Sequence, residues 1–217
     1  MDGLIKEFHV DKLHVSIYKT RRQMGMAASA HYLQRLEAIL AGQPAARAVF
    51  AAAHSQDEFL EGLIEAEDAV FSRMEAFHMD EYIGLPADAP QRFGTFLSRA
   101  IFDRKPFRKV HLMNSGAGDG RQECFRYSEL LRRAPLDIVS LGIGENGHIA
   151  FNDPHEARFD DPETVKITTL DEPCRQQQVH DGEFADISLV PHQAMTLTIR
   201  TKPTTPLKAS APQNSML

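Results

Sequence analysis

The segment PLDIVSLGIGENGHIAFNDP, residues 135–154, decides how the chain can fold. Its first half, PLDIVSLGI at 135–143, is a short apolar run typical of a buried strand. Its end and the residues just after it contain three glycines: Gly142, Gly144 and Gly147. Glycine loses more backbone entropy on ordering than any other residue, so regular structure does not favour it there. The pattern predicts a buried strand that reverses tightly into a loop.

The rest of the chain alternates short β-branched runs with stretches of helical period. Strands are expected at 13–18, 46–53, 71–79, 109–114, 135–143 and 194–199, and helices at 21–40, 57–64, 90–102 and 121–133. Such alternation predicts an α/β fold with a mainly parallel sheet and helices on both faces.

The end of the chain follows a different pattern. Residues 200–217 contain three prolines, little apolar content and no periodicity, which is typical of an irregular tail. We therefore expect one α/β domain over 1–199 and an irregular tail over 200–217. The sheet is expected to be truncated at its C-terminal end, without a final covering helix.

Composition restricts the class of partner. The 217 residues carry a formal charge of −6 and a sequence pI of about 5.9, which argues against nucleic-acid binding. No run approaches the roughly 18 apolar residues that span a bilayer, and the N-terminus does not resemble a secretion signal. We expect a cytoplasmic protein without membrane contact, in which Cys124 and Cys174 are buried and reduced.

Chemistry is expected in the loops that follow strands, because ligands of open α/β sheets bind beyond the carboxyl ends of the strands. This rule selects HSQ at 54–56, DEYIGLP at 80–86 and GENGHIAFNDP at 144–154. A glycine-rich turn of this kind lets backbone N–H groups approach a ligand oxygen. The same glycines also occur in ordinary turns, so the pattern alone leaves both interpretations open.

Two groups in these loops are suited to proton transfer. His148 lies between Glu145 and Asp153 in the sequence, and neighbouring carboxylates orient a histidine and tune its pKa. Asp80 and Glu81 are adjacent, so in an extended segment they point to opposite sides and one of them is a candidate base. Solvated loop carboxylates are the alternative interpretation.

Other kinds of catalysis have less support. The sequence has no HExxH or CxxC motif and no G-x-S-x-G elbow, so we expect neither a metal site nor a nucleophilic serine. His78 falls inside an expected strand, where a histidine is usually a hydrogen-bonded core residue.

Two motifs resemble those of the glucosamine-6-phosphate deaminase/isomerase family: FHMDEYIGLP at 77–86 and LGIGENGHIAFNDP at 141–154. TVKITTLDEPCRQQQ at 164–178 and AMTLTI at 194–199 continue the resemblance, which covers roughly 13–199. It implies a Rossmann-like sheet, as in phosphogluconolactonases and ribose-5-phosphate isomerases. The implied reaction converts glucosamine 6-phosphate to fructose 6-phosphate and ammonia, without a metal or organic cofactor.

The resemblance also implies roles for single residues. Asp80 matches the base that moves a proton from carbon 2 to carbon 1, and His148 matches the histidine that opens the ring. Asp153 matches the acidic partner of that histidine, which is usually glutamate, and Asn146 replaces a common aspartate. Because asparagine cannot stabilise an imidazolium by charge, we expect a lower His148 pKa than in a carboxylate-rich relative. Glu145 is a candidate to supply the missing charge.

Substrate contacts are expected at Ser55, Gly144 and Gly147. The family commonly has a G-[GS]-T-P phosphate loop where this chain has AAAHSQ at 51–56, so Ser55 is either an anion donor or an ordinary helix cap. The family's later phosphate-facing lysine has no counterpart that we can assign within 200–217.

Three hypotheses remain open from the sequence. The first is an amino-sugar phosphate isomerase/deaminase with a small-molecule substrate and the tendency of its family to form homo-oligomers. The second is a 6-phosphogluconolactonase-like hydrolase, and the third is a catalytically weak sugar-phosphate-binding or truncated relic protein. Ammonia release, lactone opening, or binding without turnover distinguishes them.

Overall fold

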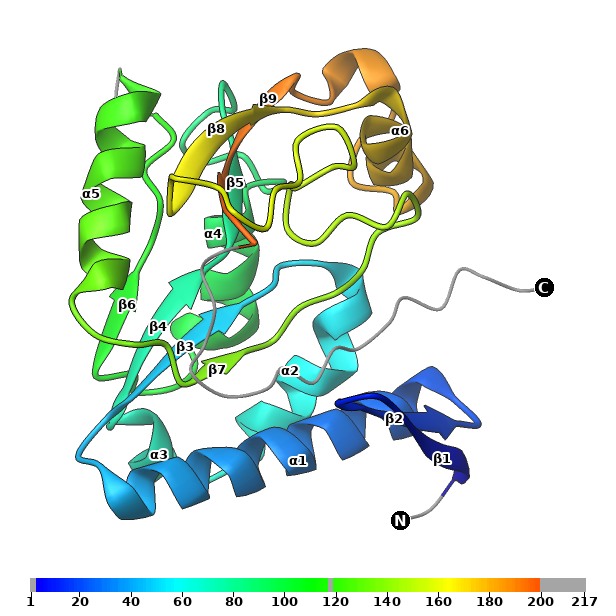
Figure 1. Ribbon diagram of the computed structural model, residues 1–217, viewed down its shortest axis with the longest axis vertical. Coiled ribbons are helices and arrows are strands. Elements are labelled where there is room, and N and C mark those ends of the chain that lie inside the picture. Colours follow the sequence, from blue (N-terminus) through cyan, green and yellow to red (C-terminus); the bar gives the residue numbers. More distant parts are fainter. Residues whose placement is uncertain (1–2, 117–118, 200–217) are drawn as a thin grey trace.

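The computed structural model describes residues 3–116 and 119–199 and centres on a parallel sheet (Figure 1). Four strands lie in the order β6–β4–β3–β7, and all three neighbouring pairs are parallel. Their bounds are β3 Ala46–Phe50, β4 Met74–His78, β6 Lys109–His111 and β7 Ile138–Val139. The predicted α/β class is confirmed.

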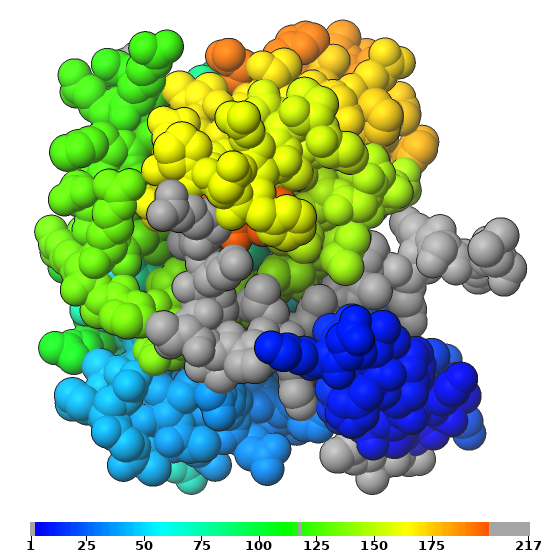
Figure 2. Space-filling model, viewed as in Figure 1, coloured from blue at the N-terminus to red at the C-terminus, as the bar shows by residue number. Residues whose placement is uncertain are grey.

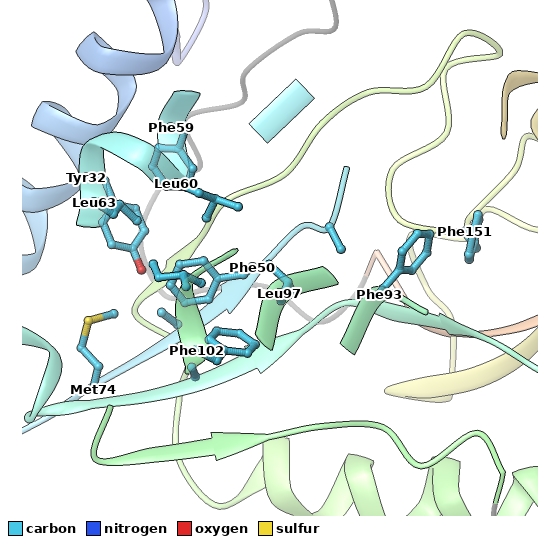
Figure 3. Close-up of a cluster of buried hydrophobic side chains, with 14 of the residues drawn as sticks. Tyr32, Phe50, Phe59, Leu60, Leu63, Met74, Phe93, Leu97, Phe102 and Phe151 are labelled. Carbon is cyan, nitrogen blue, oxygen red and sulfur yellow. The ribbon is translucent and has the colours of Figure 1, made fainter. Parts of the chain in front are cut away.

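Helices cover both faces of this sheet. Successive residues of a strand point to opposite faces, so each strand contributes side chains to two cores. Ala48 and Phe50 of β3 pack into one core with α1 (Arg21–Gly42) and α2 (Asp57–Ile64). Val49 of β3 packs into a second core with α5 (Gly120–Arg132). Figure 3 shows the aromatic part of the first core, where Tyr32 and Phe59 gather with Phe50.

A second sheet of three antiparallel strands stands beside the first. It has the order β5–β9–β8, with β5 Asp80–Tyr82, β8 Val165–Thr169 and β9 Gln193–Leu197. The chain passes from β4 of the parallel sheet to β5 at Met79, whose carbonyl oxygen accepts the Leu197 N–H at 2.8 Å. The sequence placed Asp80–Tyr82 in a loop after a strand, whereas the structure continues it as a strand of another sheet.

The N-terminal segment forms a separate antiparallel hairpin, with β1 Leu4–Val10 paired to β2 Leu13–Tyr18. The expected strand at 13–18 is therefore present, but its partner is β1. Figure 2 shows this hairpin in blue at the lower right of the molecule. The hairpin consequently does not contribute to the strand ends where the candidate site lies.

Shorter helices connect the strands. They are η1 His54–Gln56, α3 Asp68–Phe71, α4 Phe93–Leu97, the π-helical turn η2 Ser98–Phe102, α6 Glu172–His180 and η3 Ile187–Leu189. None of the helices in the described ranges is both long and apolar enough to cross a bilayer. The tail expected over 200–217 lies outside the described residues.

Several expected strands are shorter than the sequence suggested. β3 ends at Phe50 and β6 at His111, each three residues early, and the runs 135–143 and 71–79 shorten as well. Of the apolar run 135–143, only Ile138–Val139 forms a strand, although the N–H groups of Asp137 and Ser140 also donate to β3 carbonyl oxygens, and Leu136 and Leu141 are buried by packing. Of the run 71–79, Phe71 ends α3 and the strand begins at Met74. Apolar side chains mark burial in both runs, but burial does not require a hydrogen-bonded ladder.

Candidate active site

The loop after β7 uses its glycines to fold back on itself. The N–H of Gly144 donates to the His148 carbonyl oxygen, and the N–H of Gly147 donates to the Gly144 carbonyl oxygen, both at 2.9 Å. Gly147 has φ +86°, a left-handed conformation that favours glycine. A Cβ on Gly144 would lie only 2.1 Å from Cε1 of His148. The loop therefore requires glycine where the backbone passes the imidazole ring.

This geometry bears on the substrate contacts expected at Gly144 and Gly147, which remain a prediction. The sequence suggested that their N–H groups approach a ligand oxygen, but both groups are already hydrogen-bonded inside the loop. Their function in this structure is to let the loop turn tightly and to seat His148. The ring of His148 thus rests on the backbone of its own loop.

Asn146 fixes the orientation of His148. Its Oδ1 lies 2.7 Å from Nδ1 of His148 and also accepts the His148 backbone N–H at 3.1 Å. A carboxylate oxygen of Asp153 lies 3.4 Å from the same ring nitrogen. Because an amide oxygen only accepts hydrogen bonds, Nδ1 carries the proton in the neutral ring and Nε2 keeps its lone pair. His148 is thereby set to exchange a proton through Nε2.

A network of carboxylates holds Asn146 in turn. Its Nδ2 donates to Asp153 Oδ1 at 3.0 Å and to both carboxylate oxygens of Asp171 at 3.2 Å. The second oxygen of Asp153 accepts the Asp171 backbone N–H at 3.0 Å. Asp171 also caps α6 by accepting the Cys174 N–H at 2.7 Å. The start of α6 therefore positions the loop that carries His148.

The sequence did not single out Asp171, and it offered Glu145 in its place. Glu145 is exposed and lies 3.6 Å from His180 through its carboxylate. Asp171 sits in the motif TVKITTLDEPCRQQQ, two residues before Pro173 near a helix start, which is a signal for an N-cap. That signal marked a cap, but it did not indicate that the cap also contacts Asn146.

Burial lowers the pKa of His148 below its ordinary value, and this effect exceeds the opposing attraction of Asp153, Asp171 and Asp181. The lower His148 pKa expected relative to a carboxylate-rich family member stays a prediction, because the lowering seen here comes first from loss of solvent. A lowered pKa keeps the imidazole neutral near pH 7, as a group that both accepts and donates protons requires.

Asp80 approaches the same place from β5. It stands opposite Thr196 of β9, and opposite residues of an antiparallel pair share one face of the sheet. The Thr196 hydroxyl accepts the Phe151 N–H at 3.0 Å, so the loop that carries His148 lies on that face. The Tyr82 ring, two residues after Asp80, lies 5.3 Å from the Phe151 ring. Figure 3 shows Phe151 beside Phe93 at this end of the core.

The adjacent carboxylates Asp80 and Glu81 have different environments. Glu81 is fully buried and accepts the backbone N–H groups of Tyr82, Phe93 and Gly94 at 3.0–3.1 Å, which ties it to the start of α4. Asp80 is buried too, but within the described residues its carboxylate receives no hydrogen bond. Burial, and then repulsion from Glu81, raises the pKa of Asp80 well above its ordinary value. Of the two, Asp80 is the carboxylate left available for chemistry.

Cys174 connects the two halves of the site. Its sulfur lies within 4.8 Å of ligand atoms of both His148 and Asp153. Burial, a hydrogen bond to Asp153, and the charge of Asp80 all raise the pKa of its thiol. Cys174 therefore lies beside His148 and Asp153, and the charge of Asp80 also acts on its thiol. Both cysteines are buried and free, as expected.

Ser55 lies at the neighbouring strand end. A Cβ on Gly142 would lie 3.8 Å from the Ser55 hydroxyl, so the loops after β3 and β7 meet there. The interpretation of Ser55 as the cap of α2 is wrong, because the N-cap is Gln56 and makes no side-chain cap bond. Asp57 and Glu58 occupy the first turn of α2, so this helix start does not favour an anion.

His78 behaves as a core histidine. It is fully buried, and its Nε2 accepts the Met113 N–H at 2.8 Å. Burial lowers the pKa of His78 to about 4. His78 therefore stays neutral and supports the turn after β6, as the sequence suggested.

A separate hollow of about 460 Å³ opens beside the loop after β3. It is lined by His54, Phe96, Arg99 and Glu183, among others, and by none of the expected site residues. His54 spans its rim, with ring nitrogens 3.0 Å from Asp57 and 3.3 Å from Glu183. These ion-pairing contacts join the loop after β3 to the segment that follows α6.

The fold and the cluster define an α/β protein whose strand-end site combines a neutral histidine with an uncommitted buried carboxylate. The sequence model of the family described as glucosamine-6-phosphate isomerases/6-phosphogluconolactonase matches residues 19–178. The chain belongs to this family.

Individual relatives agree with this assignment. The chain is 42% identical over 100 residues to glucosamine-6-phosphate deaminase of Streptococcus sanguinis, a match that covers 46% of this chain and 42% of the relative. It is 37% identical over 134 residues to the Lysinibacillus sphaericus deaminase, covering 62% and 58%. The chain thus spans about half the length of the curated relatives that it matches.

Solved structures share the fold. A monomeric glucosamine-6-phosphate deaminase superposes with a TM-score of 0.74 at 27% identity, over 84% of this chain and 74% of that one. The 6-phosphogluconolactonase of Thermotoga maritima gives a TM-score of 0.67 at 20% identity, over 82% and 74%. The second likeness concerns the fold alone.

Proposed function

We propose that this chain converts glucosamine 6-phosphate to fructose 6-phosphate and ammonia by proton transfer on the opened sugar. The observation that carries the proposal is the convergence of Asp80 and His148 on one face of the antiparallel sheet. Cys174 lies beside His148, and the charge of Asp80 acts on its thiol. The curated relatives described above are named for this deaminase activity. An aldose–ketose conversion needs two positioned proton-transfer groups, and the cluster contains two.

His148 is assigned to ring opening. Its Nε2 takes the proton of the carbon-1 hydroxyl and returns it to the ring oxygen, while Asn146 holds Nδ1–H. Asp153 supports this ring from 3.4 Å and stabilises the imidazolium that forms briefly. The lowered His148 pKa makes the return of the proton favourable.

Asp80 is assigned to the carbon acid. Its carboxylate removes the proton from carbon 2 and delivers it to carbon 1, which leaves an imine at carbon 2 for water to hydrolyse with release of ammonia. A raised pKa makes Asp80 a stronger base than an exposed aspartate. Ser55 is retained as a candidate substrate contact, because its hydroxyl lies at the adjoining strand end.

The decisive experiment measures ammonia release from glucosamine 6-phosphate by wild type and by Asp80→Asn. Removal of a positioned base is expected to lower kcat by about 100-fold or more. Asp137→Asn is the matched control, because Asp137 accepts the Arg47 N–H at the opposite end of the parallel sheet. Equal rates for wild type and Asp80→Asn would show that Asp80 is not the base.

The lactonase hypothesis is tested in the same preparation. The family description includes 6-phosphogluconolactonase, and structures with that activity share the fold. Opening of 6-phosphogluconolactone without ammonia release from the amino sugar would favour the hydrolase. Binding of glucosamine 6-phosphate without either turnover would favour the catalytically weak protein.

We also propose that the chain acts in the cytoplasm. Its proposed substrate is a phosphorylated sugar, and its two cysteines are buried free thiols, as is usual in a reducing compartment. Oligomer formation, which the resemblance implies, is tested by light scattering of the purified chain. A homo-oligomer is the expected state, and a monomer at all concentrations would contradict it.

A further inference from the structure

We propose that His148, Asp153 and Cys174 form a binding site for a soft divalent cation, with Zn²⁺ as the best match. The three side chains come from the loop after β7 and from α6, and their ligand atoms all lie within 4.8 Å of one another. Binding of the ion stands apart from the proposed reaction. Its consequence for catalysis rests on the proposed role of His148.

The donor set selects the metal. An imidazole nitrogen, a carboxylate oxygen and a thiolate sulfur are the ligands that zinc uses, whereas Mg²⁺ and Ca²⁺ prefer oxygen alone. Nδ1 of His148 and Oδ1 of Asp153 are 3.4 Å apart. Two such ligands on a tetrahedral zinc, at about 2.0–2.1 Å from the ion, lie roughly 3.3 Å apart. The distance between Nδ1 of His148 and Oδ1 of Asp153 therefore already suits a tetrahedral zinc site.

Surrounding groups hold the ligands in place. The Asp153 side chain is 0% exposed and that of His148 11%, so neither is free to swing into solvent. Asn146 and the Asp171 backbone both donate to Asp153 at 3.0 Å, and the capped start of α6 fixes Cys174. Such outer contacts orient metal ligands and are part of a working metal site.

Binding changes the protonation of two ligands. The Cys174 thiol, which hydrogen-bonds to Asp153, loses its proton to solvent and coordinates as thiolate. The neutral imidazole gives Nδ1 to the ion, so its single proton moves to Nε2 and the bond to Asn146 is lost. One proton is released per ion. With Nε2 protonated, His148 no longer accepts a proton from the sugar, so the bound ion inhibits ring opening.

A neighbouring cluster is the competing location. Asp153, His155 and Asp171 also bring ligand atoms within 4.8 Å, but this set has no sulfur and the His155 side chain is 48% exposed. The two clusters share Asp153. Removal of Cys174 affects only the first cluster, and removal of His155 affects only the second.

The test titrates the full chain with Zn²⁺ and with Co²⁺, using calorimetry and absorption. We expect one ion per chain and, for Co²⁺, a thiolate-to-metal charge-transfer band in the near ultraviolet. Cys174→Ser should weaken Zn²⁺ binding by more than the 10–100-fold loss that removal of an outer contact causes. Cys124→Ser is the matched control, since it removes the other of the two cysteines, and His155→Ala controls for the neighbouring cluster.

Three results would overturn the site. The first is wild-type Zn²⁺ affinity in Cys174→Ser, and the second is a Co²⁺ complex of the wild-type chain without the thiolate band. The second measurement needs no variant, so it holds even if Cys174→Ser does not fold. Loss of Zn²⁺ binding in His155→Ala but not in Cys174→Ser would place the ion in the neighbouring cluster and also refute the proposal.

The inhibitory consequence has its own readout. Zn²⁺ should suppress ammonia release by wild type and by Cys124→Ser, Mg²⁺ should not, and the ratio of rates with and without Zn²⁺ should return to one in Cys174→Ser. Zn²⁺ bound with undiminished turnover would refute the inhibition. Absence of turnover in the metal-free wild type would count against the proposed function, while the calorimetric and Co²⁺ results would still decide the metal site.

Discussion

Asp80 and Thr196 stand opposite each other in the ladder of β5 and β9, and the Thr196 hydroxyl binds the backbone of Phe151. This one row of the sheet places a buried carboxylate on the same face as the loop that carries His148. The arrangement costs stability, because the Asp80 carboxylate receives no hydrogen bond from the described residues.

Asp80→Asn should therefore stabilise the fold at neutral pH while it removes activity. The folded-state pKa of Asp80 is raised above the unfolded value of about 3.9, so stability from this group is complete below about pH 3.9 and falls as pH rises through the folded pKa. We expect a higher melting temperature at pH 7, by about 2–4 °C per kcal/mol recovered, and no difference near pH 3. An equal or lower melting temperature at pH 7 would contradict this account.

Glu81 should have the opposite effect on stability. Its carboxylate accepts three backbone N–H groups, including two at the start of α4. Glu81→Ala leaves these buried donors unpaired and should lower the free energy of unfolding by about 3 kcal/mol or more in urea titrations, with a smaller loss for Glu81→Gln. Glu61→Ala is the control, since the Glu61 side chain is 58% exposed and its removal should change stability by less than about 0.5 kcal/mol. Similar losses for Glu61→Ala and Glu81→Ala would refute the anchoring role.

Gly144→Ala and Gly142→Ala form a matched pair. An alanine Cβ at 144 would lie within 2.1–2.5 Å of ring atoms of His148, whereas at 142 its nearest neighbour would lie 3.8 Å away. Displacing the imidazole by about 1 Å should lower ammonia release by about 100-fold. Gly142→Ala should retain the wild-type rate of ammonia release, measured under the same conditions. Equal rates for the two variants would mean that the position of the ring is unimportant.

The pKa of His148 should respond to Asn146 but not to Glu145. Asn146→Asp places a negative charge beside Nδ1, which is now 2.7 Å from an amide oxygen, and should raise the pKa of His148 by about 1–3 units in an NMR titration. Glu145→Gln should leave it unchanged, because Glu145 pairs with His180. A His148 pKa that stays constant in Asn146→Asp would show that burial alone sets it.

The sequence predicted those elements whose own residues determine them. Helices expected at 21–40, 57–64 and 121–133 are present with nearly the same bounds, since each has caps or an apolar stripe of its own. The apolar run 135–143 was harder to interpret. Leu136 and Leu141 are buried by packing against other elements, so apolar content alone overestimated the length of the strand.

The site was predictable only in part. Motifs identified Asp80, Asn146, His148 and Asp153, and the structure gathers these four around α6 and β9. Asp171 and Cys174 were missed as members because they reach the cluster from a different segment, and no local spacing encodes that approach. Side chains that meet only through tertiary packing have no motif of their own.

The passage of the chain between two sheets at Met79 attaches the candidate site to both of them. Asp80 and the His148 loop are both attached to the antiparallel sheet, through β5 and through Thr196 of β9. Ser55 instead follows β3 of the parallel sheet, and the loop that carries His148 begins after β7 of that same sheet. A rotation of one sheet against the other would therefore pull on this loop, because the loop is anchored to both sheets.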